Sequence, residues 1–175
     1  MIRGLQSLKL WPGKSQLSGL RLPASLGVDV NKRTAAALKI WSSSLAAGGT
    51  LVERYLISRG IVLSPPRELR FHPALKHPSD EFVPTMVALV TDGVDGSPRA
   101  IHRTYLAPDG NGKAAVSPLR AMIGPCRGGV VRLAQANEIV MVGEGIETCL
   151  AAMQATGKPA WAALSTSGLR TLDLP

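Results

Sequence analysis

The chain has 175 residues, of which 45% are hydrophobic and 18% are charged, a composition typical of a globular protein rather than a disordered or coiled-coil one. No apolar segment approaches the roughly 20 residues of a membrane-spanning helix, and no secretory signal core is present, so we expect a soluble, cytoplasmic protein without a membrane partner. The net charge of +8 is uneven, because residues 1–40 contain seven Lys or Arg and one acid, Asp29.

The first segment, residues 1–30, is predicted to be a basic, disordered tail, because Gly and Pro interrupt it and no hydrophobic period is sustained. Such a segment attracts nucleic acid phosphates by releasing their counterions. A solvated chain end without any partner explains the same charge bias.

Two helices are predicted at the start of a second segment, residues 31–135. Ala37, Trp41 and Leu45 form an apolar stripe of helical spacing that Gly48-Gly49 ends. Thr50 and Glu53 match a capping box for a second helix, which is expected to end at Gly60. The short connection between these helices predicts a helical hairpin.

The rest of this segment is predicted to be an antiparallel, β-rich meander. Residues 69–72, 85–91, 100–106 and 130–133 have strand character, and turn dipeptides such as Asp92-Gly93 separate them. Alternation places His102 and Arg103 on opposite faces of their strand. Gly110–Lys113 lacks the spacing of a phosphate loop, so a hairpin turn is the favoured interpretation.

The last segment, residues 136–175, changes to a strand–helix–strand pattern. Residues 139–142 and 160–164 are apolar and short, and residues 148–155 between them are rich in Ala and Leu. This order predicts a βαβ unit with parallel strands, at whose carboxyl ends ligands gather. Glu144 and the 165–168 loop follow those two strand ends, so the predicted class is α/β in this segment and α+β overall.

Glu144 and Glu147 are the residues with the clearest chemical potential. Two carboxylates at a strand end can hold a divalent metal or transfer a proton. Stabilisation of a helix N-terminus by their charge is the structural alternative. The two cysteines, Cys126 and Cys149, have no CxxC partner, and the histidines lack metal-ligand spacing, so a zinc site is not expected.

The segment Val142-Gly143-Glu144-Gly145-Ile146-Glu147-Thr148 resembles the first motif of the Toprim fold of primases, topoisomerases and related nucleases. Further segments resemble Toprim-containing primase-like proteins of bacterial plasmids, phages and integrated elements, and the likeness spans about residues 33–175. These segments are Leu69–Pro73, Ala100–Leu106, Gly124–Gly129 and Ala163–Leu169.

The resemblance implies metal-dependent nucleotidyl or phosphoryl transfer in DNA replication, with Glu144 as the catalytic carboxylate and Glu144 and Glu147 as metal-associated groups. The family's Mg²⁺ or Mn²⁺ is bound by an Asp-x-Asp pair on a later strand, and no Asp-x-Asp occurs in this chain. We therefore expect a chain truncated within its Toprim domain and incomplete for catalysis. The expected partners are DNA and either a replicative helicase or a missing C-terminal Toprim half.

Basic residues of the β-rich segment are candidate nucleic-acid contacts, namely Arg70, Arg103, Lys113, Arg127 and Arg132, and His102 could join them on a basic face. Alternation places His102 and Arg103 on opposite faces, so not all six can converge. The leading hypothesis is thus a primase-like DNA replication protein of a mobile element. The alternative is a non-catalytic module for nucleic acid binding or assembly, which would bind DNA without regard to Glu144 or metal.

Overall fold

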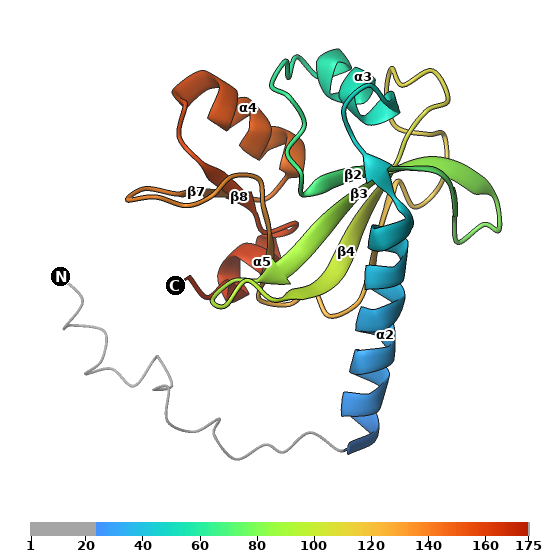
Figure 1. Cartoon of the computed structure of the whole chain (residues 1–175), viewed down its shortest axis with the longest axis vertical. Coiled ribbons are helices and arrows are strands. Elements are labelled where there is room, and N and C mark those ends of the chain that lie inside the picture. Colours follow the sequence, from blue (N-terminus) through green and yellow to red (C-terminus); the bar gives the residue numbers. More distant parts are fainter. Residues whose placement is uncertain (1–23, 175) are drawn as a thin grey trace.

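The computed structural model of the chain describes residues 24–174, which form four helices and an eight-stranded, mostly antiparallel sheet (Figure 1). The helices are α2 (Ala24–Ser43), α3 (Leu51–Ser58), α4 (Ile146–Thr156) and α5 (Thr166–Thr171). The strands are β1 (Leu45–Ala46), β2 (Leu69–Lys76), β3 (Phe82–Asp92), β4 (Pro98–Tyr105), β5 (Arg120–Ile123), β6 (Gly129–Arg132), β7 (Met141–Gly143) and β8 (Ala160–Ala162). The predicted α+β class is confirmed.

The sheet is built around β3, the longest strand. The antiparallel pairs β2–β3, β3–β4 and β4–β5 form the predicted meander. Strand β6 pairs with the end of β3 at Thr91 and Asp92, and β8 then joins β6 in antiparallel fashion. The last strand, β7, is parallel to β8, and α4 connects the two. The predicted βαβ unit is therefore confirmed, and it extends the same sheet.

The predicted helical hairpin is wrong, because α2 and α3 cover opposite faces of the sheet. Ala37 of α2 packs with Val87 of β3, whereas Leu56 of α3 packs with Met86, the preceding residue of β3. Adjacent strand residues point to opposite faces, so the two helices cannot lie on the same side. Helix α2 ends at Ser43, and the chain crosses the sheet edge as β1, which pairs with β2 (Figure 1).

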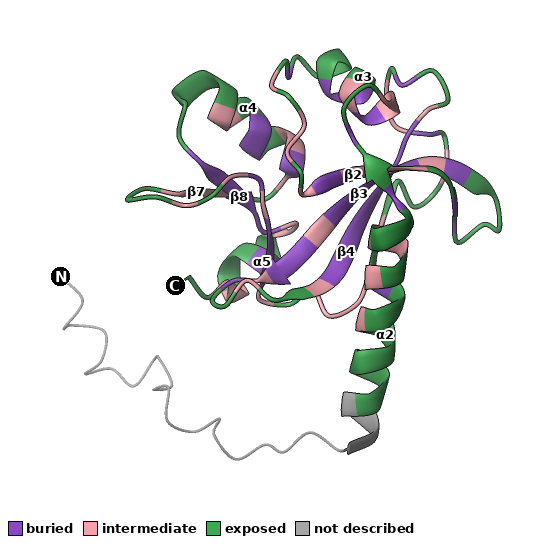
Figure 2. Ribbon diagram, in the orientation of Figure 1, coloured by how far each residue is buried: buried purple, intermediate pink, exposed green. Residues whose placement is uncertain are grey.

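Helix α2 begins at Ala24, so residues 24–30 are helical where a disordered tail was predicted. No proline occurs between residues 24 and 43, and three successive alanines at 35–37 favour a helix. Its first described side chains, including Val28 and Val30, are exposed because this end extends beyond the sheet (Figure 2). Residues 1–23 of the predicted tail lie outside the described part of the chain.

The main core is shared by the two predicted segments. It unites Val52 and Leu56 of α3 with Ile146 and Leu150 of α4, and the inward side chains of β3, β6 and β8. Residues 31–135 and 136–174 therefore pack as one body, although the sequence pattern changes between them. Between residues 24 and 174, no helix combines the length and the hydrophobicity that crossing a bilayer would require.

Candidate functional site

Glu144 lies at the carboxyl end of β7, on the turn that leads into α4, as predicted. Its side chain is exposed, and its Oε2 accepts a hydrogen bond of 3.1 Å from Thr166 Oγ1. Thr166 is the first residue of α5, which follows β8 after residues 163–165 and which was predicted to be part of a loop. The ends of the two parallel strands thus meet, because β7 and β8 are adjacent and run in the same direction.

Glu147 lies further along α4 and faces a different environment. Its Oε1 accepts a 2.6 Å hydrogen bond from the hydroxyl of Tyr55 on α3. Lys113 Nζ and Arg120 Nη2 each lie 3.7 Å from the same oxygen. Burial alone would raise the pKa of Glu147, but the Tyr55 hydrogen bond, its own backbone amide and the two cations hold that pKa below its ordinary value. Burial, together with Glu147, raises the pKa of Tyr55.

A cleft of about 260 Å³ collects these groups, and we call it the cation cleft. Arg59 follows α3, Lys113 follows the 109–112 turn and Arg120 starts β5, so three separate segments supply its positive charges. Its lining residues are Arg59, Lys113, Arg120, Glu144, Gly145, Glu147, Thr148 and Leu164. Burial lowers the pKa of Lys113, and the attraction of Glu147 opposes that shift. The cleft therefore combines three basic side chains with two carboxylates.

Two buried polar side chains of β4 lie on the sheet face that carries this cleft. Thr104 is paired with Arg120 across the β4–β5 ladder, and His102 is two residues away on the same face. Within residues 24–174, His102 Nδ1 and Thr104 Oγ1 are buried without a hydrogen-bond partner. Burial, followed by repulsion from Arg120, lowers the pKa of His102 to about 4, so its imidazole is neutral at pH 7.

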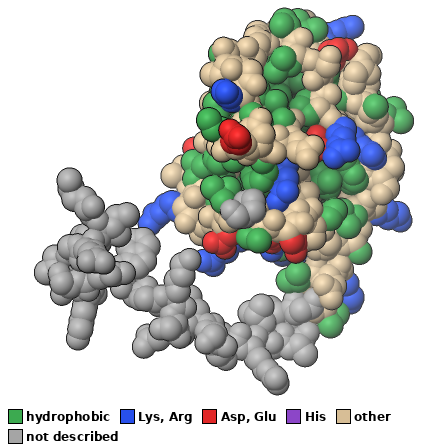
Figure 3. All heavy atoms as spheres, turned by 60° about the vertical axis from the view of Figure 1, so that its left-hand side comes forward, with side chains coloured by type: hydrophobic (Ala, Val, Ile, Leu, Met, Phe, Trp, Pro, Cys, Tyr) green, Lys and Arg blue, Asp and Glu red, His purple; other side chains and the backbone are tan. Residues whose placement is uncertain are grey.

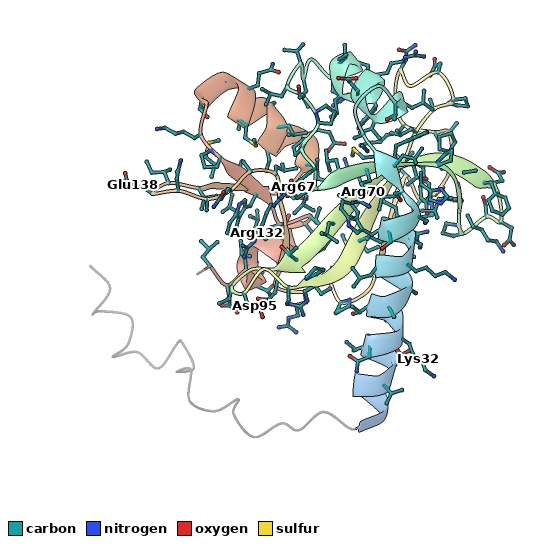
Figure 4. The ribbon with its side chains drawn as sticks, in the orientation of Figure 1. Lys32, Arg67, Arg70, Asp95, Arg132 and Glu138 are labelled. Atoms are coloured by element: carbon teal, nitrogen blue, oxygen red, sulfur yellow. The ribbon has the colours of Figure 1, made fainter. Side chains whose placement is uncertain are left out.

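The predicted nucleic-acid contacts do not gather in one place. Arg70 Nη1 donates to the Trp41 carbonyl at 3.0 Å and its guanidinium lies 4.3 Å from the Trp41 ring. Arg132 Nη2 donates to the carbonyls of Asp92 and Gly93, 3.1 and 3.0 Å away. Figure 4 shows Arg70 near the sheet end of α2 and Arg132 in a different part of the sheet. Both guanidinium groups have structural partners within the fold.

The other three predicted contacts also separate. Arg103 is only 8% exposed and donates to the carbonyl of Lys76, on the face opposite His102. Arg127 is exposed and borders a different cavity, leaving Lys113 in the cation cleft. On the face shown in Figure 3, Lys and Arg side chains form separate groups with hydrophobic and neutral surface between them. The role of these five residues in nucleic acid binding stays a prediction.

The two carboxylates differ in their fitness for a divalent metal. Glu144 is exposed and has only a hydroxyl donor, so its oxygens suit a hard cation. Glu147 already accepts a hydrogen bond from the Tyr55 phenol. The two cations beside it, Lys113 and Arg120, would repel a metal ion. Among the residues that the structure describes, no group of three or more His, Cys, Asp or Glu side chains could hold a metal. Glu144 fits as one ligand of a larger set, and Glu147 does not.

Sequence reasoning missed Tyr55, Arg59 and Arg120. Tyr55 lies inside the second predicted helix with no local feature that marks it, and Arg59 is an ordinary basic residue beside Gly60, where that helix was expected to end. Arg120 belongs to β5, a four-residue strand that was not predicted. Its side-chain direction follows only from the β4–β5 register, which pairs it with Thr104.

A family model described as a domain of unknown function, DUF7146, matches residues 31–133, which is more than half of the chain. The matched region contains α3, the meander and β6, and therefore all three cations of the cleft. Glu144 and Glu147 lie beyond it. No curated protein and no solved structure matches the chain.

Proposed function

We propose that this chain, which belongs to the DUF7146 family, is a primase-like DNA replication protein of a mobile element. The observation that supports this most is that Glu144 and the basic residues Arg59, Lys113 and Arg120 line one cleft. Transfer of a phosphoryl or nucleotidyl group needs positive charge at the phosphate oxygens and a carboxylate near the reacting atoms. The resemblance to Toprim-containing primases, carried by residues 142–148, favours the same reaction class.

The proposed roles follow from position. Arg59, Lys113 and Arg120 neutralise phosphate oxygens, while Glu144 takes a proton from the attacking hydroxyl or ligates a metal. Thr166 holds Oε2 of Glu144 by a hydrogen bond and so limits the orientations of that carboxylate. Bound Mg²⁺ or Mn²⁺ would neutralise charge on the transferred group. Because the chain contains no Asp-x-Asp, we propose that its catalytic site needs carboxylates from a further Toprim half.

The alternative proposal, a non-catalytic module for nucleic acid binding or assembly, has support of its own. Glu147, the second predicted metal ligand, is engaged by Tyr55, Lys113 and Arg120. The part of the chain covered by the structure holds no three-ligand group for a metal. A cleft with one free carboxylate can bind phosphates without performing chemistry on them.

Binding of a fluorescent single-stranded oligonucleotide at low salt, with and without Mg²⁺, separates these proposals. The primase-like role predicts that Mg²⁺ strengthens binding and that Glu144→Gln removes this increment. Glu138→Gln is the matched control, since Glu138 is exposed and lies at the far end of the segment that precedes β7 (Figure 4). Oligonucleotide affinity that is unchanged both by Mg²⁺ and by Glu144→Gln would favour the alternative.

Two further outcomes bear on the proposals. Absence of DNA binding at low salt would count against both. Primer synthesis by the purified chain with Mg²⁺ or Mn²⁺, abolished by Glu144→Gln, would show that no further Toprim half is required.

A further inference from the structure

The cation cleft holds more hydrogen-bonding capacity than the chain itself uses. Lys113 Nζ and Arg120 Nη2 lie 3.7 Å from Glu147 Oε1, beyond the 2.7–3.2 Å of a hydrogen bond between nitrogen and oxygen. Within residues 24–174 neither side chain has another carboxylate partner. Glu147 therefore attracts the two cations but leaves their N–H groups free to donate to an added anion.

We infer that the cation cleft binds a phosphate group through Arg59, Lys113 and Arg120, carried by a nucleotide or by a nucleic acid backbone. This inference rests on the proposed function and assigns a ligand to the cations that line the cleft with Glu144. A phosphate presents several acceptor oxygens, and Arg and Lys are the side chains that donate to it most effectively. Glu147 acts as a positioning residue that keeps the cations together when the ligand is absent.

Two buried polar side chains of β4 lie near the cations of the cleft. His102 is 5% exposed and Thr104 is 1% exposed, and each has a buried side-chain atom without a hydrogen-bond partner in the described structure. Unsatisfied polar atoms in a protein interior are uncommon and need a physical explanation. Both residues lie on the sheet face of Arg120, and neither lines the cleft. Their buried polar atoms add to the polar character of the surroundings of the cations.

The size of the cleft limits the ligand portion that it can hold. Its volume of about 260 Å³ is below the roughly 300–1,000 Å³ of sites that enclose a drug-sized molecule. A neighbouring cavity of about 420 Å³ shares Leu164 with it and is lined by Met122, two residues from Arg120 on the same strand face. The cation cleft suits a phosphate, and the adjoining cavity offers room for the remainder of a nucleotide.

Calorimetric titration of the full chain with inorganic pyrophosphate tests the inference. Arg120→Met and Lys113→Met should each weaken pyrophosphate binding about tenfold, the effect of losing one hydrogen bond to a charged group. Arg67→Met is the matched control, because the Arg67 side chain is 94% exposed and, among the residues that the structure describes, its one ion pair is with its neighbour Glu68. This control should bind like the wild type, and circular dichroism would verify that all variants are folded.

Two further ligands identify the source of the phosphate. Tighter binding of ATP than of pyrophosphate, lost in Arg120→Met, would assign a nucleotide. A tenfold loss for an oligonucleotide, with ATP no better than pyrophosphate, would assign the nucleic acid backbone. Undetectable pyrophosphate binding at millimolar concentration, or folded Arg120→Met and Lys113→Met that bind like the wild type, would overturn the inference.

Failure of this inference differs from failure of the proposed function. The Mg²⁺-dependent increase in DNA binding could still depend on Glu144 while pyrophosphate binding is unchanged by Arg120→Met and Lys113→Met. In that case the primase-like role survives and the phosphate site is refuted. If pyrophosphate binding depends on the cations while DNA binding ignores Glu144, the phosphate site survives and the alternative function is favoured.

Discussion

The hydrogen bond between Tyr55 and Glu147 joins the DUF7146 region to the βαβ unit, and its removal has a predictable energetic effect. Tyr55 is 1% exposed, so Tyr55→Phe keeps the packed ring and deletes only the hydroxyl. The lost bond is 2.6 Å long and ends on a carboxylate whose side chain is 14% exposed. Hydrogen bonds to charged groups contribute about 1.5–3 kcal/mol. We expect about 2 kcal/mol less unfolding free energy at pH 7 in urea denaturation, or a Tm about 4–8 °C lower.

The second tyrosine of the chain is a matched control. Tyr105 is fully buried, and its hydroxyl has no hydrogen-bond partner in the described residues. Tyr105→Phe therefore removes an unsatisfied group and should leave stability unchanged or raise it. Equal losses in the two variants, or a loss below about 0.5 kcal/mol for Tyr55→Phe, would refute the assigned strength of the Tyr55–Glu147 bond.

Acid weakens this bond in a defined direction. The folded protein holds the pKa of Glu147 below its ordinary value, so the stability that this carboxylate contributes is present above the unfolded pKa. That contribution is lost as pH falls through the folded pKa. The difference in unfolding free energy between the wild type and Tyr55→Phe should therefore shrink as the solution is acidified, and a constant difference would contradict the role of Glu147.

Three further outcomes are expected. Burial lowers the folded pKa of His102 from 6.5 to about 4, so its NMR titration midpoint should lie near 4, and its contribution to stability should fall as pH drops from about 6.5 to about 4. Gly168→Ala places a Cβ against the Ala163 carbonyl oxygen and should cost about 1–3 kcal/mol in urea denaturation, whereas Gly112→Ala meets open space and should change stability by less than about 0.5 kcal/mol. Burial raises the pKa of the Cys149 thiol to about 11, so a thiol reagent should label it only in urea.

The β-rich region was predictable because its signals are local. A short run rich in apolar residues identified β3, alternating side chains identified β4, and Asp92-Gly93 identified the turn between them. In that turn Asp92 Oδ1 accepts from the amide of Val94 at 2.9 Å, which is the local bonding expected of Asp at a turn. Such patterns need no knowledge of the distant chain. The same holds for the βαβ unit, whose strand, helix and strand are contiguous.

The failed predictions involve long-range geometry. The helical stripe of Ala37 and Trp41 indicated which side of α2 is apolar, but could not indicate which sheet face it covers. The hairpin prediction assumed that short connections keep helices adjacent, whereas the two residues of β1 join the sheet edge between them. Helix α5 was missed because its six residues are too few to show a hydrophobic period. Its N-cap residue, Ser165, accepts a 2.9 Å hydrogen bond from the amide of Gly168.

The cation cleft explains why no single sequence motif predicts this site. Its cations belong to the region that matches DUF7146, and its carboxylates belong to the segment that resembles Toprim. Either segment alone would hold charges of one sign only, three cations or two carboxylates, and like charges held together without their counterions repel one another. The β6–β8 ladder and the Tyr55–Glu147 bond keep the two halves in register. In our proposal, the DUF7146 region therefore forms one side of a composite phosphate site, and the turn that carries Glu144 forms the other.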